Sequence, residues 1–350
     1  MNSDVKVHRV PGAPHILVDG FKHIKPGISC VVLTHAHADH TTGLAEAVKR
    51  GWPPGLRVVC TPITKRLVEH KHGVDGAVVT PLDLEATTDV GGVKVTFLDA
   101  HHCPGAAMVV FNVDGVYHLH CGDMKHVSGN SVHGMLSSVT IDTLFLDTTY
   151  AHKRHVLPLP SEACAQVATT VAALPEDTLV CIGAYTIGKE AVLMAASDAM
   201  EGCNICIPES KVALLECTGT IPPTRFTTDP TSTRLHCVAM SVGGELWPYF
   251  RVDYQSVVTY MESVLVAGGE AQRRYPACVV FLPTGWAGSG FNSKHSKWVS
   301  SKPVPCVCGG EDTGGVNITV HLVAYTEHSD YPGLQDFVRQ VRPRRVVPTV

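Results

Sequence analysis

Four side chains able to bind a metal ion lie within six positions near the start of the sequence: His35, His37, Asp39 and His40. They follow the apolar, β-branched run at 30–33, which is typical of a buried strand. In an extended chain, residues two apart project to the same side, so His35 and His37 can offer two imidazoles to one metal ion. Asp39 and His40 come where the chain must turn, which lets them face a second ion. The alternative, that these histidines merely decorate a loop, fits this dense spacing poorly.

Two further predicted strands end in residues of the same kind. One apolar segment is followed by His101 and His102, and another by Asp123. Three strand ends at one sheet edge would form a hydrolytic metal site, with several neutral nitrogens, a bridging carboxylate from Asp123 and open positions for water. The sequence alone leaves open which of His101 and His102 is the ligand. The nearby Cys103 and Cys121 are typical of small buried residues.

The overall composition indicates a globular protein. The 350 residues are 45% hydrophobic and 17% charged, which excludes a disordered, collagen-like or coiled-coil chain. No apolar run approaches the ~18 residues that span a membrane, and the first residues lack the layout of a secretory signal, so we expect an intracellular protein without a membrane partner. The 13 cysteines are odd in number and scattered, as expected for reduced thiols. The 20 histidines favour metal binding, whereas the net charge of -4 argues at first sight against a polyanionic partner.

The pattern along the chain predicts alternating strands and helices, with a change of texture near residue 150. Before this point, short β-branched runs alternate with Gly, Pro, His and Asp, and short helices are predicted at 44–49 and 63–70. The elements predicted after it are, in order, helix 161–174, strand 178–183, helix 189–200, strand 316–325, helix 331–341 and strand 345–350.

Several short motifs, taken together, resemble those of a known enzyme family. The histidine motif at 35–40, followed by a lone histidine and a lone aspartate, is similar to the metallo-β-lactamase pattern. Neighbouring segments narrow the resemblance to the β-CASP branch, and within it to the DNA cross-link-repair nucleases that include Artemis and Apollo. These segments are 18–21, 99–105, 122–123, 146–150, 186–190, 283–286, 325–329 and 348–350. The resemblance covers nearly the whole chain, and its motifs are specific as a set.

This resemblance implies a fold and a division of the chain. The fold would be α/β, with two mixed sheets flanked by helices in a metallo-β-lactamase αββα sandwich. Residues 1–155 and 316–350 would form this domain, and residues 156–315 would form an inserted β-CASP α/β domain.

The resemblance also implies a set of metal ligands, for one or two zinc ions. The residues that would hold the first ion are His35, His37, His102 and Asp123. Those that would hold the second are Asp39, His40 and the shared Asp123. His102 takes the role rather than His101 because it directly precedes Cys-Pro-Gly. Asp19 would orient a ligand imidazole, although from the residues alone it could equally be a turn residue before Gly20.

Asp147 and His328 would join Asp39 and His40 as catalytic residues. In the family, the histidine contacts the scissile phosphate or the leaving oxygen, and the carboxylate orients it. His328 would then supply a proton to a departing alkoxide. Without the resemblance, His328 would be interpreted as a surface histidine near a helix start.

Lys189 and Ser329 are the candidates for substrate binding. Lys189 opens a predicted helix whose N-terminal amides favour anions, although it could equally be a solvated first-turn residue. The family often has a second serine after the position of Ser329, whereas here Asp330 follows, and a carboxylate repels phosphate. The basic run at 152–155 is also atypical, and could line a DNA groove or simply solvate a loop.

The function implied is metal-assisted hydrolysis of phosphodiester bonds in DNA, in the nucleus. The activity would be a 5'-to-3' exonuclease in interstrand cross-link or DNA-end repair, acting on single-stranded or end-containing duplex DNA. Val350 favours DNA over RNA, because RNA-processing members carry a metal-binding histidine there. The alternatives are an Artemis-like structure-selective endonuclease, and a non-catalytic scaffold, which would not need the full ligand set.

Overall fold

The computed structural model describes residues 8–245, 250–268, 275–288, 298–305 and 315–350. They form two compact units. The first consists of the residues up to His155 together with Glu327–Val350, and the second is Val156–Thr326. All of the predicted site residues except Lys189 belong to the first unit.

The first unit contains a five-stranded sheet made of short strands, of which β2 and β3 are fully buried. In order across the sheet, these are β1 (His8–Arg9), β2 (Ile16–Val18), β3 (Cys30–Val32), β4 (Arg57–Cys60) and β5 (Val79–Pro81). β1 and β2 are antiparallel, and the other neighbours pair in parallel. All three residues of β3 are buried, as expected for a central strand of a sheet that is covered on both faces.

A six-stranded sheet completes the strands of the first unit. In order across it, the strands are β20 (Arg345–Pro348), β10 (Ile141–Leu146), β9 (Val116–His120), β8 (Ala107–Val113), β7 (Val93–Asp99) and β6 (Thr87–Val90). β6 to β9 form an antiparallel meander, and β10 and β20 add to it in parallel. β7, β9 and β10 therefore run in the same direction, so their carboxyl ends lie along one edge of the sheet.

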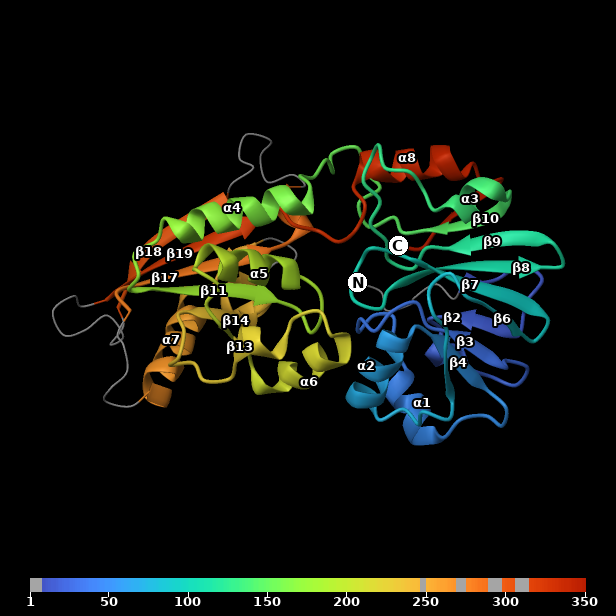
Figure 1. The fold of residues 1–350 in the computed structure, drawn as a ribbon, viewed down its shortest axis with the longest axis horizontal. Helices are drawn as coiled ribbons and strands as arrows, with labels where there is room; N and C mark the ends of the chain where they lie inside the picture. Colours follow the sequence, from blue (N-terminus) through green and yellow to red (C-terminus); the bar gives the residue numbers. More distant parts are fainter. Residues whose placement is uncertain (1–7, 246–249, 269–274, 289–297, 306–314) are drawn as a thin grey trace. The chain divides into compact units, whose positions relative to one another are not determined.

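Helices cover the outer faces of the two sheets (Figure 1). The sheets face each other across a core that includes Val32, Phe97 and Phe111. α1 (Leu44–Arg50) and α2 (Pro62–His72) lie on the five-stranded sheet, and α3 (Gly134–Ser138) and α8 (Tyr331–Val341) pack on the six-stranded sheet. The order helix, sheet, sheet, helix confirms the αββα sandwich predicted from the sequence.

The second unit is built on a seven-stranded sheet. Its order is β13 (Phe226–Thr227), β12 (Ile205–Cys206), β14 (Leu235–Ala239), β11 (Thr178–Ala184), β17 (Ala277–Pro283), β19 (Val316–Val323) and β18 (Trp298–Val304). Its strands pair in parallel except at β18. The short strands β15 (Gly244–Glu245) and β16 (Arg251–Val252) form a separate pair.

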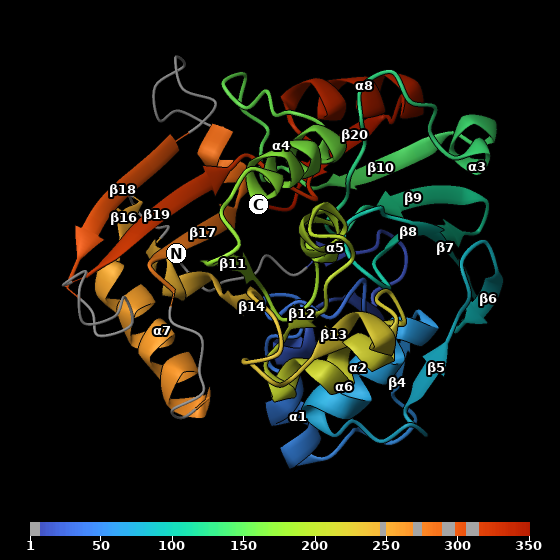
Figure 2. The same ribbon diagram turned by 60° about the vertical axis from the view of Figure 1, so that its left-hand side comes forward.

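Helices cover both faces of this sheet, as in doubly wound α/β folds. The helices on one face are α4 (Pro160–Ala172), α5 (Glu190–Ala199) and α6 (Glu209–Thr218), and α7 (Tyr254–Gly268) packs on the other. Figure 2 shows α4 and α7 on opposite sides of the strands. This is the inserted α/β layer structure that the sequence predicts.

The end of the insertion lies further along the chain than the sequence predicts. A return to the first domain at residue 316 would place β19 in the sandwich. Instead, β19 pairs in parallel with β17 and antiparallel with β18, which makes it an interior strand of the second unit. Its alternation of buried and half-exposed residues gives no sign of which sheet it joins. The chain returns to the first unit at Glu327.

The helices of the described residues are short, from five residues in α3 to 15 in α7. Within that part of the chain, none has the length and apolar character needed to cross a lipid bilayer.

Candidate metal centre

Loops at the ends of strands bring the predicted ligands together. His35 and His37 follow β3, His102 follows β7, and Asp123 follows β9. The turn into Asp123 requires Gly122, because its φ is +56° and a Cβ there would lie 2.8 Å from Thr34. A buried sheet therefore fixes the starting point of each loop, and the loop directs the side chain.

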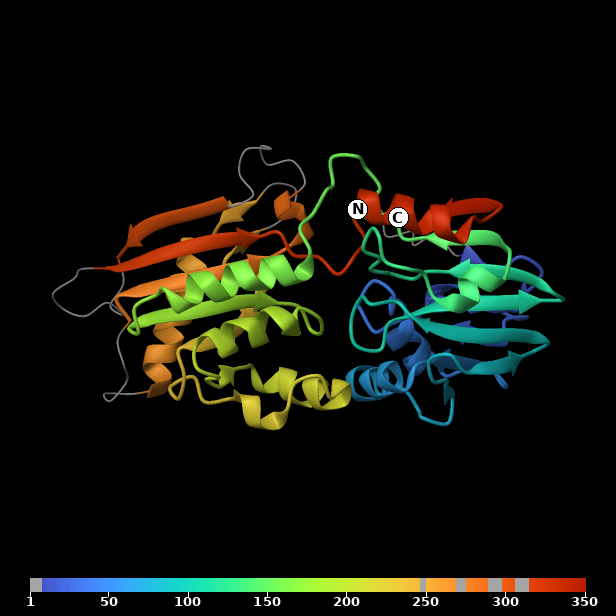
Figure 3. The ribbon, with the colours of Figure 1, turned by 45° about the horizontal axis from the view of Figure 1, so that its top comes forward.

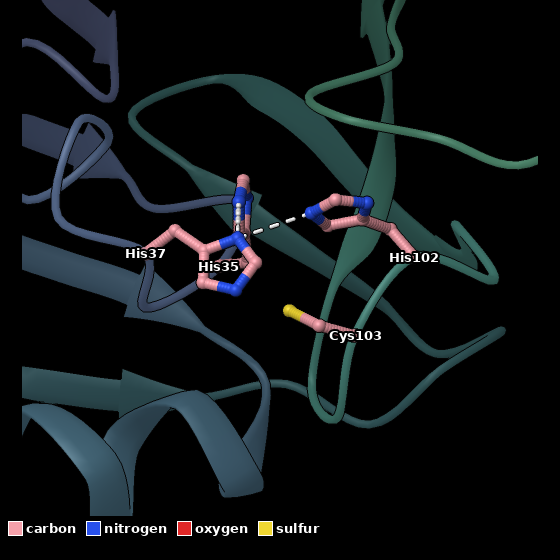
Figure 4. A group of neighbouring side chains, drawn as sticks. All are labelled: His35, His37, His102 and Cys103. Carbon is pink, nitrogen blue, oxygen red and sulfur yellow. Dashed lines mark hydrogen bonds between the residues drawn. The ribbon is translucent and has the colours of Figure 1, made fainter. Parts of the chain in front are cut away.

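Three imidazole nitrogens converge in one cluster (Figure 4). His37 Nδ1 lies 3.1 Å from His35 Nε2 and 3.1 Å from His102 Nε2. Nitrogens that each lie about 2.05 Å from a tetrahedral metal ion are about 3.3 Å apart, so this spacing fits a shared ion. The Cys103 thiol lies within 4.8 Å of these nitrogens, although the sequence predicts an ordinary small residue there.

A chain of hydrogen bonds fixes the tautomer of His35. The Thr34 hydroxyl donates to Asp19 Oδ2 over 2.8 Å, so its oxygen accepts from His35 Nδ1, 3.0 Å away. With its proton on Nδ1, His35 directs the lone pair of Nε2 at the cluster. Burial lowers the pKa of His35 well below its ordinary value, and the nearby His40 lowers it further, so the ring is neutral, as a metal ligand must be.

A backbone carbonyl fixes His102 in the same way. Its Nδ1 lies 2.9 Å from the oxygen of Glu327, which can only accept, so the lone pair of Nε2 faces the cluster. Burial lowers the pKa of His102 to about 3, helped by the neighbouring His328. His101, in contrast, exposes 70% of its side chain and pairs with Asp99 over 3.3 Å. The geometry therefore favours His102 over His101 as the ligand.

His40, Asp123 and Asp39 form a second group beside the first. His40 Nε2 lies 3.2 Å from Asp123 Oδ1 and 3.7 Å from Asp39 Oδ2. On its other side, His40 Nδ1 lies 2.7 Å from Asp19 Oδ2, which places Asp19 to orient this imidazole. Burial would lower the pKa of His40, but Asp123 and Asp19 raise it well above its ordinary value. These carboxylates attract positive charge to this point, and a divalent ion can provide it.

The two oxygens of Asp123 face different groups. Oδ1 lies nearest to His40, whereas Oδ2 lies 3.7 Å from His35 Nε2 and 3.6 Å from His102 Nε2. Burial would raise the pKa of Asp123, but His40 and His328 hold it well below its ordinary range, so the carboxylate is ionised. A carboxylate placed in this way can contribute one oxygen to each of two adjacent ions.

This donor set fits a metal centre better than a hydrogen-bonded cluster. The Nε2 lone pairs of His35 and His102 both face His37 Nδ1 and the ionised Asp123. These lone pairs and the carboxylate repel one another unless a cation lies between them. Imidazole nitrogens with a carboxylate oxygen are ligands that zinc binds. The side chain of Asp39 is 72% exposed, so the second group is open to solvent.

A histidine–aspartate pair adjoins the two groups. His328 Nδ1 lies 2.8 Å from Asp147 Oδ2, and His328 Nε2 lies 3.8 Å from Asp123 Oδ2. Asp147 is buried and also accepts from the backbone N–H groups of Met124 and Thr149, so its position is fixed. Burial would lower the pKa of His328, but Asp147 and Asp123 raise it to about 9. In the metal-free protein these two carboxylates therefore favour the protonated form of the ring.

Ser329 does not have the surroundings expected of a substrate-binding residue. It is buried, and its hydroxyl donates to the Met124 carbonyl over 3.1 Å and accepts from the His126 N–H over 2.8 Å. Both hydrogen-bonding roles are used within the protein, so Ser329 is placed to hold the segment after Asp123. The carboxylate of Asp330 caps α8 at its N-terminus, which explains the residue that departs from the family pattern.

Lys189 belongs to the second unit. It has a φ of +66° and directly precedes α5, so the helix begins one residue later than predicted. The residue is buried, and its ammonium lies 4.9 Å from the centre of the Tyr185 ring and 5.5 Å from that of Tyr325. Its role in substrate binding stays a prediction.

Thr34 and His120 support the site but are not predicted from the sequence. Besides its hydroxyl contacts, Thr34 donates its backbone N–H to Asp19 Oδ1 over 2.8 Å. His120 Nδ1 accepts from the Gly122 N–H over 3.0 Å, which supports the turn into Asp123. The only signal available for either was its position, one and three residues before a predicted ligand.

Comparison with known families agrees with this geometry. A family model described as beta-lactamase superfamily domain matches residues 18–212, and one described as DNA repair metallo-beta-lactamase matches residues 222–350. The chain belongs to the β-lactamase superfamily and carries the domain of its DNA-repair metallo-β-lactamases.

Three similar curated proteins are related along almost all of this chain. The DNA cross-link repair protein SNM1 of Arabidopsis thaliana is 32% identical over 98% of the chain. The DNA cross-link repair 1A protein of Homo sapiens is 30% identical over 98%, and the 5' exonuclease Apollo of Gallus gallus is 29% identical over 97%. The chain spans 65%, 30% and 63% of their respective lengths.

A solved structure shares the fold. It is the crystal structure of a protein of unknown function from Enterococcus faecalis V583, with a TM-score of 0.53 and 12% sequence identity. The match covers 91% of this chain and 74% of that one.

Proposed function

We propose that this chain is a metal-dependent DNA nuclease that hydrolyses phosphodiester bonds, with 5'-to-3' exonuclease activity in interstrand cross-link or DNA-end repair. The observation that carries the proposal is the position of Asp123. Its Oδ2 faces His35 and His102, two of the three converging imidazoles, and its Oδ1 faces His40. The protonated His328 lies beside the same carboxylate.

The proposed cofactor is zinc, as one or two ions. The residues that would hold the first ion are His35, His37, His102 and Asp123, and those that would hold the second are Asp39, His40 and Asp123. When bound, such an ion would act as a Lewis acid that acidifies water and neutralises charge on a phosphodiester. Asp19 supports both groups, because it contacts His40 directly and His35 through Thr34.

His328 is the proposed proton donor to the leaving oxygen. Its Nδ1 proton is committed to Asp147, which leaves the proton on Nε2, the nitrogen that faces Asp123. Asp147 thus has two functions: it fixes the direction of the ring, and it favours the protonated form. A general acid of this kind contributes about 10²- to 10⁴-fold to the rate.

The proposed substrate is single-stranded or end-containing duplex DNA, in the nucleus. The names of the related proteins refer to DNA cross-link repair and to a 5' exonuclease. Val350 supports DNA over RNA, because its apolar side chain has no atom that could bind a metal. Its backbone forms hydrogen bonds with the hydroxyl of Thr148, the residue that follows Asp147.

A nuclease assay on single-stranded DNA with a 5'-phosphate or a 5'-hydroxyl tests the proposal. We expect end-labelled substrate to be degraded to single nucleotides, and cleavage to stop when a chelator is added. Internal cuts in a labelled hairpin would instead indicate an endonuclease. Replacing Asp39 and His40 by Ala should abolish cleavage while leaving the protein folded, whereas His101→Ala, which changes an exposed histidine, should not affect cleavage. Cleavage by the double variant would refute the proposal.

A further inference from the structure

The connection after β10 is attached at both ends to the residues around His328. At its start, Asp147 Oδ2 lies 2.8 Å from His328 Nδ1, and the ring of Tyr150 lies 5.9 Å from the His328 ring. At its end, the His155 carbonyl accepts from the backbone N–H of Tyr331 over 3.0 Å. In Figure 3 this green segment passes the start of the red helix α8. Its middle residues are therefore held close to the proposed proton donor.

The middle of this segment, the basic loop His152–Arg154, exposes uncompensated positive charge. All three of its residues are exposed. Within the described part of the chain, neither Lys153 nor Arg154 forms an ion pair with a carboxylate, unlike Arg225, which lies 2.6 Å from Asp198. Arg154 instead donates from Nε to His155 Nε2 over 3.3 Å. Such a loop is suited to bind an anionic partner.

An open apolar hollow of ≈ 340 Å³ adjoins the basic loop. Its apolar lining consists of Leu146, Ala151, Leu334 and Val338. Tyr331 adds an aromatic ring, and the exposed Arg339 adds another cation at the same surface. Along the chain, Ala151 immediately precedes the basic loop, and Leu146 immediately precedes Asp147. We refer to this apolar hollow as the α8 hollow.

We propose that the basic loop and the α8 hollow together bind single-stranded DNA next to the site of cleavage. Lys153 and Arg154 contact backbone phosphates, and one base occupies the hollow against Tyr331. Cations that follow the backbone, combined with an aromatic surface for bases, are the means by which proteins bind single strands. Six extended residues span at most about 22 Å, so Lys153 contacts phosphates within a few nucleotides of Asp147. The inference rests on the proposed nuclease function and specifies where its substrate lies.

Binding of a short, fluorescein-labelled oligothymidylate, measured by fluorescence anisotropy in the presence of a chelator, tests this inference. In the double variant K153Q/R154Q, the slope of log affinity against log salt concentration should become shallower by about 1.4, because each phosphate contact to a single strand contributes about 0.7. Ala151→Trp, which fills the hollow, should weaken binding at least about fivefold with an unchanged slope. The matched control K49Q/R50Q removes another exposed Lys-Arg pair, at the end of α1, and should leave both quantities unchanged.

The outcomes separate this inference from the proposed function. If the wild-type chain cleaves DNA but K153Q/R154Q keeps the wild-type salt slope, the role of the basic loop is overturned. The nuclease function would still stand. Wild-type affinity in Ala151→Trp would overturn the role of the hollow. A wild-type chain that does not cleave DNA would refute the proposed function, and this inference with it.

Discussion

Replacing Thr34 by Val should weaken metal binding while leaving the fold intact. Valine replaces the hydroxyl of threonine by a methyl group of similar size, so the contact of this residue with Gly122 is kept. The substitution removes only the hydroxyl, which donates to Asp19 Oδ2 over 2.8 Å and lies 3.0 Å from His35 Nδ1. Asp19 keeps two other donors, the Thr34 backbone N–H and His40 Nδ1.

The expected loss of metal affinity follows from the hydrogen-bond donor of His35 that loses its acceptor when the hydroxyl is removed. His35 is fully buried, so its Nδ1–H loses its acceptor and the proton is free to move to Nε2, the nitrogen proposed to bind metal. A buried donor without a partner costs about 1–3 kcal/mol. Loss of a group that orients a metal ligand lowers affinity roughly 10- to 100-fold, which is about 1.4–2.7 kcal/mol, so the two estimates agree.

Competition with a chromophoric zinc chelator measures this loss. Thermal unfolding of the metal-free protein should change less than the zinc affinity, because without metal His35 can place its proton on Nε2, which faces Asp123. Thr143→Val is the matched control: Thr143 is also fully buried, and its hydroxyl bonds to Asp142, which is not a proposed ligand. Equal zinc affinity in wild type and Thr34→Val would refute the proposed orientation of His35 through Thr34.

Three further predictions concern buried polar groups. His120→Leu should weaken zinc binding because Gly122 loses its acceptor, whereas His120→Asn, which keeps an oxygen near the position of Nδ1, should restore most of the affinity. Ser329→Ala should lower the free energy of unfolding by about 1–3 kcal/mol, because the N–H of His126 loses its hydrogen-bond acceptor. The KM for DNA should stay unchanged. A higher KM with unchanged stability would instead favour a contact between Ser329 and the substrate. Burial lowers the pKa of His236, so below about pH 6.5 the unfolded chain takes up a proton that the folded chain does not, and stability falls. His236→Gln should reduce this acid sensitivity in unfolding experiments from pH 8 to pH 5.

The clustering of the proposed ligands could be anticipated from the sequence because much of their spacing is local. The motif at 35–40 follows a buried strand, and its three histidines lie near one another, as a shared metal centre requires. The helix predicted at 331–341 is observed with the same bounds, because Asp330 caps its start and its apolar residues repeat along one face. Local pattern was sufficient for these features.

The residues that support the ligands were not predictable, because their contacts join distant parts of the chain. Glu327 reaches His102 through a backbone carbonyl, which no side-chain type reveals. Ser329 was expected at the substrate, but its hydroxyl is used by the segment after Asp123. The end of the inserted domain was predicted at residue 316 for the same reason. The residue pattern of β19 fits a strand of either domain, and only its pairing with β17 shows that it belongs to the inserted one.

Metal binding by the purified chain tests the central claim most directly. After removal of metal with a chelator, titration with Zn²⁺ should show one or two ions bound per chain. His102→Ala should abolish or strongly weaken the first binding event, and His40→Ala the second, whereas His101→Ala should bind as the wild type does. A chain that binds no zinc, or one whose binding is equally affected by His101→Ala and His102→Ala, would contradict the metal centre.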